Sequence, residues 1–166
     1  ELNFRPRPFA IRLHRYAGLL LAAFLIVSGV TGSLLAFHAE IDRWLNPQWF
    51  NATSTDKQLP LSSVVVAVEA RYPDAYVNRI KLPQAARDSL KLFLEPRLSS
   101  QTGAALEVNR LYIDPGSGEL LGARHWGSLR FDRAHFVPFV YELHHRLHLG
   151  KLGSWLLGVV AIMWAL

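Results

Sequence analysis

The sequence predicts an α-helical transmembrane bundle, of which the chain holds helix 1 and the start of helix 2, with an α+β domain inserted outside the membrane. Three observations support this fold class. Residues 16–37 carry no charge, residues 152–166 form a second apolar run, and the chain between them alternates polar and apolar residues. Because about 22 residues make roughly 33 Å of helix, the first stretch is long enough to cross a bilayer.

The apolar stretch 16–37 is predicted to be a retained membrane helix and not a cleaved signal peptide. Its apolar core is too long for a signal peptide, and no small-x-small cleavage site precedes Glu40. Four arginines crowd its amino-terminal flank, whereas acidic residues balance the one arginine that follows it. The positive-inside rule therefore places the amino terminus in the cytoplasm and the chain after Phe37 outside.

The second apolar run, 152–166, has about 15 residues, too few to cross a bilayer. We expect it to be the start of a second transmembrane helix, and the chain to be part of a longer membrane protein. The predicted boundaries are 1–15 for a cytoplasmic segment, 16–38 for transmembrane helix 1, 39–60 for an interfacial segment and linker, 61–126 for the extracytoplasmic domain, 127–150 for an amphipathic interfacial segment and 151–166 for the start of helix 2.

Local patterns predict the remaining elements. Pro6 and Pro8 predict an irregular amino-terminal segment, and Pro47 predicts the end of the helix that leaves the membrane. Trp44 and Trp49 are typical of an aromatic belt at headgroup depth. The inserted domain is expected to contain a helix at 64–71 and strands at 76–82, 90–94, 106–113 and 119–123, the last two joined by a turn at 114–118.

Composition excludes several classes of function. The chain has no cysteine, so neither a disulfide nor a thiolate metal site is available. Its net charge of +5 includes the cytoplasmic arginines, and no basic run with interleaved aromatic residues favours nucleic-acid binding. The domain at 61–126 shows no nucleophile with a nearby base and no carboxylate cluster, which indicates recognition or scaffolding.

Histidines at the ends of the membrane helices are the candidate functional residues. His14 precedes the first apolar stretch and His38 follows it, while His144, His145 and His148 precede the second. Because the two helices run in opposite directions, His38 is expected at the same depth as His144, His145 and His148, on the outer side of the membrane. On a helical wheel, His144 and His148 share a face and His145 points elsewhere.

Small residues share one face of the first apolar stretch with a histidine. His14, Gly18, Gly29 and Gly32 fall within roughly 80° of one another on a helical wheel. Such a face admits either a closely packed neighbouring helix or a flat macrocycle, and both interpretations stay open at this point.

Several kinds of chemistry fit the histidines. Haem needs imidazoles beside a flat apolar slot, and the glycine face next to His14 suits this better than it suits a zinc cage. A zinc site would use His38, His144 and His148 with a nearby carboxylate. Proton transfer and simple interfacial packing are the other interpretations.

Three motifs in order resemble the family of PepSY-associated transmembrane proteins. The first is LHRYAGLLLAAFLIVSGVTGSLLAFHAEIDRWLNP at 13–47, in which a histidine and an apolar span lead to an acidic E-I-D and a proline. The second, LYIDPGSGELLG at 111–122, resembles the closing hairpin of a PepSY domain. The third, LHHRLHLGKLG at 143–153, is similar to the segment that leads into the family's second membrane helix.

The resemblance implies a multi-pass protein of the bacterial inner membrane with a PepSY-like domain in the periplasm. One branch of this family consists of iron-regulated ferric-siderophore reductases, which carry b-type haem at both sides of the membrane. His14 and His144 match histidines of the family pattern. His38 occupies a less fixed position, and His145 and His148 are the other candidate ligands.

The function implied by the resemblance is electron transfer to periplasmic iron. Electrons from a cytoplasmic or quinone donor would reach a ferric siderophore through two haem b groups, and reduction would release the iron. One haem is expected at His14, and the other at His38 with His144 or one of its two histidine neighbours. The alternative is a haem-free PepSY protein that acts as a regulatory or partner-binding module. Arg124, Trp126, Arg130 and Arg133 are candidates for docking an anionic or neutral chelate, and simple solvation of the surface is the other interpretation.

Overall fold

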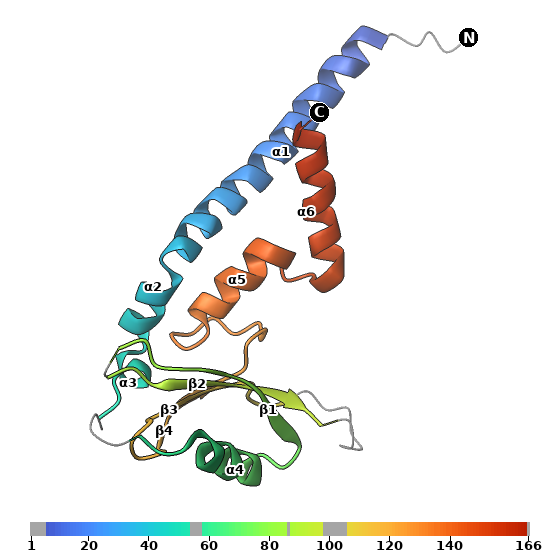
Figure 1. Ribbon diagram of the computed structural model, residues 1–166. Coiled ribbons are helices and arrows are strands. Elements are labelled where there is room, and N and C mark those ends of the chain that lie inside the picture. The colour runs from blue at the N-terminus through green and yellow to red at the C-terminus, as the bar shows by residue number, and fades with distance from the viewer. Residues whose placement is uncertain (1–5, 54–57, 86, 98–105, 166) are drawn as a thin grey trace. The chain divides into compact units, whose positions relative to one another are not determined.

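The computed structural model describes residues 6–53, 58–85, 87–97 and 106–165. Within these ranges the chain forms six helices and four strands. It divides into two compact units, of which the first contains Glu1–Phe37 and Val140–Leu166, and the second contains His38–Phe139. The first unit carries the apolar helices and the second carries the sheet (Figure 1).

A single helix, α1 (Pro6–Ala36), runs through the first apolar stretch. The prediction of irregular structure around Pro6 and Pro8 is wrong, because both prolines lie in the first turn of this helix. The first backbone N–H groups of a helix have no partner within it, so a proline there removes no hydrogen bond. The helix therefore begins before the membrane stretch, and its first turns carry three arginines.

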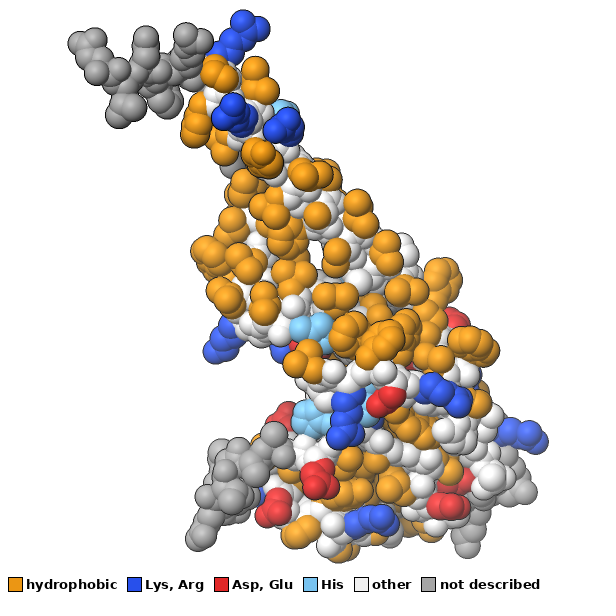
Figure 2. Space-filling model, turned by 180° about the vertical axis from the view of Figure 1, so that it is seen from behind, with side chains coloured by type: hydrophobic (Ala, Val, Ile, Leu, Met, Phe, Trp, Pro, Cys, Tyr) orange, Lys and Arg blue, Asp and Glu red, His pale blue; other side chains and the backbone are white. Residues whose placement is uncertain are grey.

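α1 has the length and composition of a membrane span. Within Arg7–Ala36, a window of 18 residues has a mean hydropathy of 2.3, and only 6% of that window is buried. Figure 2 shows hydrophobic side chains over the visible surface of this helix. Because exposed apolar side chains are unfavourable in water, a helix of this kind is suited to lipid.

The second apolar run forms α6 (Gly150–Ala165), which contacts α1 within the first unit. It follows α5 (Phe136–Arg146), and the two helices are bent by 55° relative to each other. The bend results from left-handed backbone at Leu147 and His148, with φ of 50° and 55°, and at Gly150, with φ of 59°. Together α5 and α6 are long and apolar enough for a broken membrane span or a re-entrant loop.

The second unit is built on a four-stranded antiparallel sheet in the order β1-β2-β3-β4. The helix and the strands predicted for this part of the chain are all present, although β3 starts later than predicted. Figure 1 shows the helix across one face of the sheet. These elements are α4 (Leu61–Arg71), β1 (Ala75–Lys81), β2 (Leu90–Pro96), β3 (Arg110–Ile113) and β4 (Leu120–Arg124).

Alternation along β2 decides which side chains are buried under α4. The leucines of β2 are almost fully buried and pack with Val64 and Val68 of the helix. Lys91 and Phe93 stand between these leucines, so they lie on the opposite face of the sheet. The core of the second unit is therefore on the α4 side.

Part of the opposite face is covered by α3 (Pro47–Phe50), which follows α2 (His38–Leu45). The rings of Trp49 and Phe50 each lie 5.2 Å from the ring of Tyr112 in β3, centroid to centroid. These three aromatic side chains form a second, smaller cluster of buried residues.

The predicted aromatic belt is only partly present. Trp44 is 79% exposed, as expected, but Trp49 is 9% exposed, so its assignment to the belt is wrong. The reason is that Pro47 begins a new short helix, which turns Trp49 onto the sheet. A Cβ atom at Gly122 would overlap the indole ring, so the glycine lets Trp49 approach β4 closely.

Asp114 organises the turn between β3 and β4. Its carboxylate oxygens accept hydrogen bonds from the backbone N–H groups of Thr53, Gly116 and Ser117 and from the Thr53 hydroxyl, at 2.8 to 3.2 Å. Although burial raises the pKa of a carboxyl group, these hydrogen bonds outweigh it and lower the pKa of Asp114 to about 2. The turn predicted at 114–118 is confirmed.

Candidate functional site

His144 of α5 lies against α1 at two consecutive small residues. Its Nδ1 atom is 2.8 Å from the hydroxyl oxygen of Thr31. Its Cε1 atom is 3.2 Å from the point that a Cβ atom on Gly32 would occupy, so a larger residue there would push the ring away. The imidazole is thus held by a hydrogen bond and by close packing on the helix.

The direction of this hydrogen bond follows from the other contacts of Thr31. The Thr31 hydroxyl donates to the backbone carbonyl oxygen of Val27 at 2.6 Å, with that of Ser28 farther away at 3.3 Å. Because the single hydroxyl proton is used there, the Nδ1–H of His144 donates to the Thr31 oxygen. In the neutral imidazole Nε2 then carries the lone pair, and it has no hydrogen-bond partner among the described residues. This is the state in which a histidine binds a metal through Nε2.

His145 is exposed and lies beside His144. Its Nδ1 atom is 3.0 Å from the carbonyl oxygen of Tyr141, and its ring stacks on the Tyr141 ring with centroids 4.1 Å apart. Since a carbonyl only accepts, Nδ1 of His145 donates, and in the neutral ring Nε2 carries the lone pair. The rings of His144 and His145 make an edge contact, with centroids 5.0 Å apart and an angle of 74° between the ring planes.

His148 does not share a helix face with His144, so that prediction is wrong. α5 ends at Arg146, and both Leu147 and His148 have left-handed backbone. The i, i+4 relation behind the prediction requires a continuous helix. Neither of these two residues is a glycine, and the nearest glycine with left-handed backbone is Gly150, two residues later, so the sequence marks the start of α6 more clearly than the end of α5.

His14 lies on α1 far from Thr31, and its side chain is exposed. Because α1 is continuous, the two positions are roughly 26 Å apart along the helix axis. Gly18 and Gly29 share the face of His14, and a Cβ atom on either would meet nothing within 4 Å in the described structure. This face is therefore open, except at Gly32, where the imidazole from α5 lies.

His38 is the first residue of α2 and belongs to the second unit, with an exposed side chain. Its pairing with His144, for haem or for zinc, therefore stays a prediction. Within the described part of the chain, no group of three or more His, Asp or Glu side chains is arranged to hold a metal ion.

A buried ion pair lies in the second unit. The Nη1 and Nη2 atoms of Arg124 donate to the two carboxylate oxygens of Asp42 at 2.8 and 2.5 Å. Arg124 also donates to the hydroxyl of Tyr112 and to the carbonyl oxygen of Ala134. Burial opposes the charge of Arg124, but the hydrogen bond to Asp42 outweighs it and raises the pKa. The E-I-D motif at 40–42 thus joins α2 to the sheet.

The docking role predicted for Arg124 is wrong. Its side chain is 1% exposed and its Nη atoms are engaged inside the unit, so a solute does not reach it. The other docking candidates are accessible to different degrees. Arg130 and Arg133 are exposed, Trp126 is half-buried, and Arg133 donates to the carbonyl oxygen of Leu45 at 2.6 Å.

Thr31 is the residue of the histidine site that the sequence interpretation missed. A threonine next to a glycine of the predicted glycine face was a signal of some value. Its partner, however, lies 113 residues away along the chain, and no local pattern connects the two. Long-range contacts of this kind become visible only in the folded structure.

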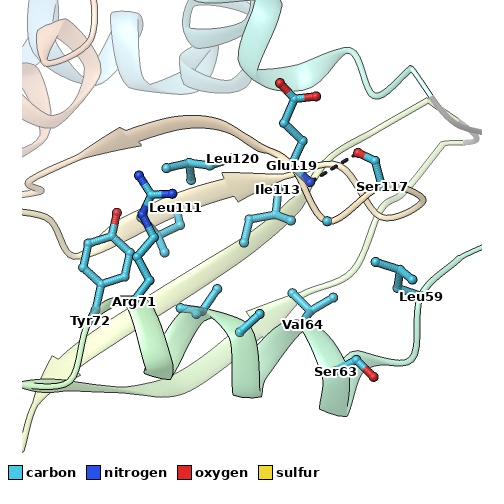
Figure 3. A pocket seen from close by; sticks show the side chains of 13 residues that line it. Leu59, Ser63, Val64, Arg71, Tyr72, Leu111, Ile113, Ser117, Glu119 and Leu120 are labelled. Carbon is cyan, nitrogen blue, oxygen red and sulfur yellow. Dashed lines mark hydrogen bonds between the residues drawn. The ribbon is translucent and has the colours of Figure 1, made fainter.

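The second unit also contains a groove of about 420 Å³ between α4 and the β3–β4 hairpin (Figure 3). Its walls are mainly apolar and include Val64, Leu111 and Ile113. Arg71 and Tyr72 lie at one end of it (Figure 3). None of the predicted site residues lines this groove, so it is separate from the histidine site.

Comparison with curated proteins finds a partial similarity to dihydropteroate synthase type-2 of Escherichia coli and of Shigella flexneri. In both cases the identity is 36% over 80 residues, which cover 45% of this chain and 30% of the relative. The chain thus spans about 30% of the length of the curated relatives that it matches. A similarity over less than half of either protein does not define the family.

A family comparison covers nearly the whole chain. The family described as the PepSY-associated TM region matches residues 11–166. This range includes the apolar part of α1, the candidate histidines and the sheet. The resemblance indicated by the three sequence motifs is thereby confirmed, and with it a membrane location. The chain belongs to the family of PepSY-associated transmembrane regions.

Proposed function

We propose that this chain is the haem-binding part of an inner-membrane reductase that passes electrons to a ferric siderophore in the periplasm. The observation that carries the proposal is the hydrogen bond between Thr31 and His144, which leaves Nε2 to bind iron. Histidines that ligate metals usually donate their other ring N–H to a fixed acceptor in this way. A histidine that served only as an interfacial side chain would need no such support.

The surroundings of His144 fit a flat apolar macrocycle. The imidazole lies on the glycine face of α1, where Gly29 leaves the helix surface open. Leu25, on the same face, is 46% exposed and offers an apolar contact. Haem b, when bound, supplies a one-electron couple between Fe(III) and Fe(II). Small and apolar residues beside an imidazole are what such a group requires.

The two family histidines have separate roles in this proposal. His144 would hold the haem on the outer side, and Thr31 acts as a positioning residue that fixes the ring and its proton. His14 would hold a haem on the inner side, roughly 26 Å away along α1. On the outer side, His38, His145 and His148 are the candidates for a second residue that would hold the haem.

The proposal includes an orientation in the membrane. The arginines in the first turns of α1 support a cytoplasmic amino terminus. The second unit is then the PepSY-like domain and lies in the periplasm, where it meets the siderophore. The protein crosses the membrane several times, and its electron donor is cytoplasmic or a membrane quinone.

Absorption spectra of the full-length protein, purified in detergent, test this proposal. We expect a Soret band that shifts when dithionite is added. His144→Ala and His14→Ala should each remove about half of the haem, because each histidine holds one of two groups. His125→Gln is the matched control, since His125 bonds the carbonyl oxygen of Leu106 in the second unit. This variant should keep all of the haem.

Two outcomes would contradict parts of the proposal. A colourless full-length protein would contradict haem binding and would favour the alternative, a regulatory or partner-binding membrane protein. A red protein whose haem content is unchanged by both alanine substitutions would contradict the assignment of the ligands.

A further inference from the structure

The face of the sheet that α4 does not cover carries two rows of cationic side chains. Strand pairing places Arg79 of β1, Phe93 of β2 and Arg110 of β3 side by side. In the next row, Lys81 and Lys91 are direct cross-strand partners. Like charges opposite each other destabilise a sheet, so this arrangement opposes folding. It therefore indicates a function of this face.

Two guanidinium groups lie against the same aromatic ring. The Cζ atoms of Arg79 and Arg110 are 3.9 and 4.4 Å from the centroid of the Phe93 ring. Arg110 also lies 5.8 Å from the ring of Trp126, and its Nη1 atom donates to the carbonyl oxygen of Asn109. Cation–π contacts of this kind fix the guanidinium groups in advance of any ligand. Their remaining N–H donors stay available to an anion.

Neither of these two arginines has a carboxylate in direct contact. Within the described ranges, neither Arg79 nor Arg110 lies at ion-pair distance from an Asp or Glu, although Glu95 offsets part of the charge of Arg110 from farther away. Glu95, on the same face, accepts hydrogen bonds from Tyr76 and Asn78 at 2.9 and 2.6 Å. Burial and then the charge of Arg79 lower the pKa of Arg110. A bound anion would relieve this repulsion.

We propose that this face, defined by Arg79, Lys81, Phe93 and Arg110, binds an anionic ferric chelate with catecholate arms. This inference rests on the proposed function, because it names the substrate class of the same protein. A tris-catecholate complex of Fe(III) is a trianion with flat aromatic rings. Guanidinium N–H groups match its phenolate oxygens, and guanidinium planes stack on its rings. A neutral tris-hydroxamate complex offers neither the charge nor the rings.

Gallium(III) complexes test binding separately from electron transfer. Gallium(III) has the charge of iron(III) but no accessible one-electron reduction, so binding is measured without turnover. The probes are the gallium complexes of a hexadentate tris-catecholate and of a hexadentate tris-hydroxamate. With the full-length protein in nanodiscs, isothermal titration should show the trianion binding at least roughly tenfold more tightly than the neutral complex. This preference should shrink as sodium chloride screens the charges.

Substitutions locate the site. The double variant R79Q/R110Q should weaken binding of the trianionic probe by roughly tenfold or more, while R79K/R110K should retain part of the affinity. R71Q is the matched control, because the Cζ atom of Arg71 also lies near an aromatic ring, 6.0 Å from that of Tyr72. Arg71 lines the groove on the α4 side, so this variant should bind the probe as the wild type does. Near-UV circular dichroism verifies that each variant is folded.

Three outcomes would overturn the inference. The first is equal affinity for the two gallium probes, and the second is unchanged affinity for the trianionic probe in R79Q/R110Q. The third is an acidic peptide, such as poly-glutamate, that binds as tightly as the trianionic probe, which would indicate a protein partner. The two proposals fail separately. A colourless protein that binds the trianionic probe through these arginines would contradict haem binding alone. A red protein with unchanged affinity in R79Q/R110Q would contradict this site alone.

Discussion

The two units of this chain differ in whether their polar groups have partners within the protein. In the second unit buried charge is matched, since Asp42 pairs with Arg124 and Asp114 accepts four hydrogen bonds. In the first unit α1 exposes its apolar side chains, and Nε2 of His144 has no partner among the described residues. The second unit is therefore stabilised by its own contacts, whereas the first is completed by lipid and, in our proposal, by a ligand.

The largest expected effect comes from removing one partner of the buried ion pair. Asp42→Ala leaves Arg124 as an uncompensated charge whose side chain is 1% exposed. We expect the free energy of unfolding to fall by about 3–5 kcal/mol. Urea unfolding followed by near-UV circular dichroism measures this in the detergent-solubilised protein. A loss below about 1 kcal/mol would show that this pair does not stabilise the second unit.

The next effect concerns His144 in the first unit. Thr31→Val keeps the shape of the side chain but removes the acceptor for the Nδ1–H of His144. Loss of such a supporting hydrogen bond lowers the affinity for the ligated group by about 10–100-fold. Titration with haem, followed at the Soret band, measures the change, and Thr31→Ser should restore most of the affinity. Unaltered haem affinity in Thr31→Val would show that the hydrogen bond between Thr31 and His144 does not support haem binding.

A smaller and pH-dependent effect is expected at the hairpin turn. The pKa of Asp114 is about 2, below its ordinary value of 3.8, so the ionised form stabilises the fold. This stabilisation is fully present above about pH 4 and is lost as the pH falls towards about 2. Asp114→Asn should cost about 1–3 kcal/mol at pH 7 and progressively less below pH 4. Urea unfolding at pH 7 and pH 3 tests this, and a pH-independent cost would contradict it.

The smallest effect is expected at an exposed ion pair of the same unit. Arg43 donates to Asp88 at 2.6 Å, but its side chain is 49% exposed. Arg43→Ala should therefore change the free energy of unfolding by about 0–1 kcal/mol. This variant removes an arginine close in sequence to Asp42, so it is a control for the first experiment. A loss of unfolding free energy as large as that of Asp42→Ala would show that the buried and the exposed ion pair contribute equally to stability.

Elements with a regular pattern were predicted well from the sequence. The alternation in β2 and the Asp-Pro-Gly turn each depend on neighbours within a few residues, and both are confirmed. The start of α1 was missed because a proline in the first turn of a helix costs nothing, so Pro6 and Pro8 did not prevent the helix. The early end of α5 was missed because Leu147 and His148 have left-handed backbone although neither is a glycine, and the glycine of this break, Gly150, comes only two residues later.

The residues of the candidate sites also fall into those that local sequence patterns predict and those that they do not. The histidines were found from their position at the ends of apolar runs. Thr31 and the burial of Arg124 were not found, because both depend on contacts between segments that are far apart in the sequence. Arg79 and Arg110 were also passed over, although alternation in their strands places them on one face. Pairing of strands, which brings the two together, is a tertiary property.

Gly32 has a consequence for the evolution of this family. The absence of a side chain at this position creates the space that the His144 ring fills. The two positions are therefore expected to change together, so that descendants with a bulky residue at 32 have also abandoned the imidazole at 144. Such co-inheritance would divide the lineage into members that have both Gly32 and His144 and members that have neither.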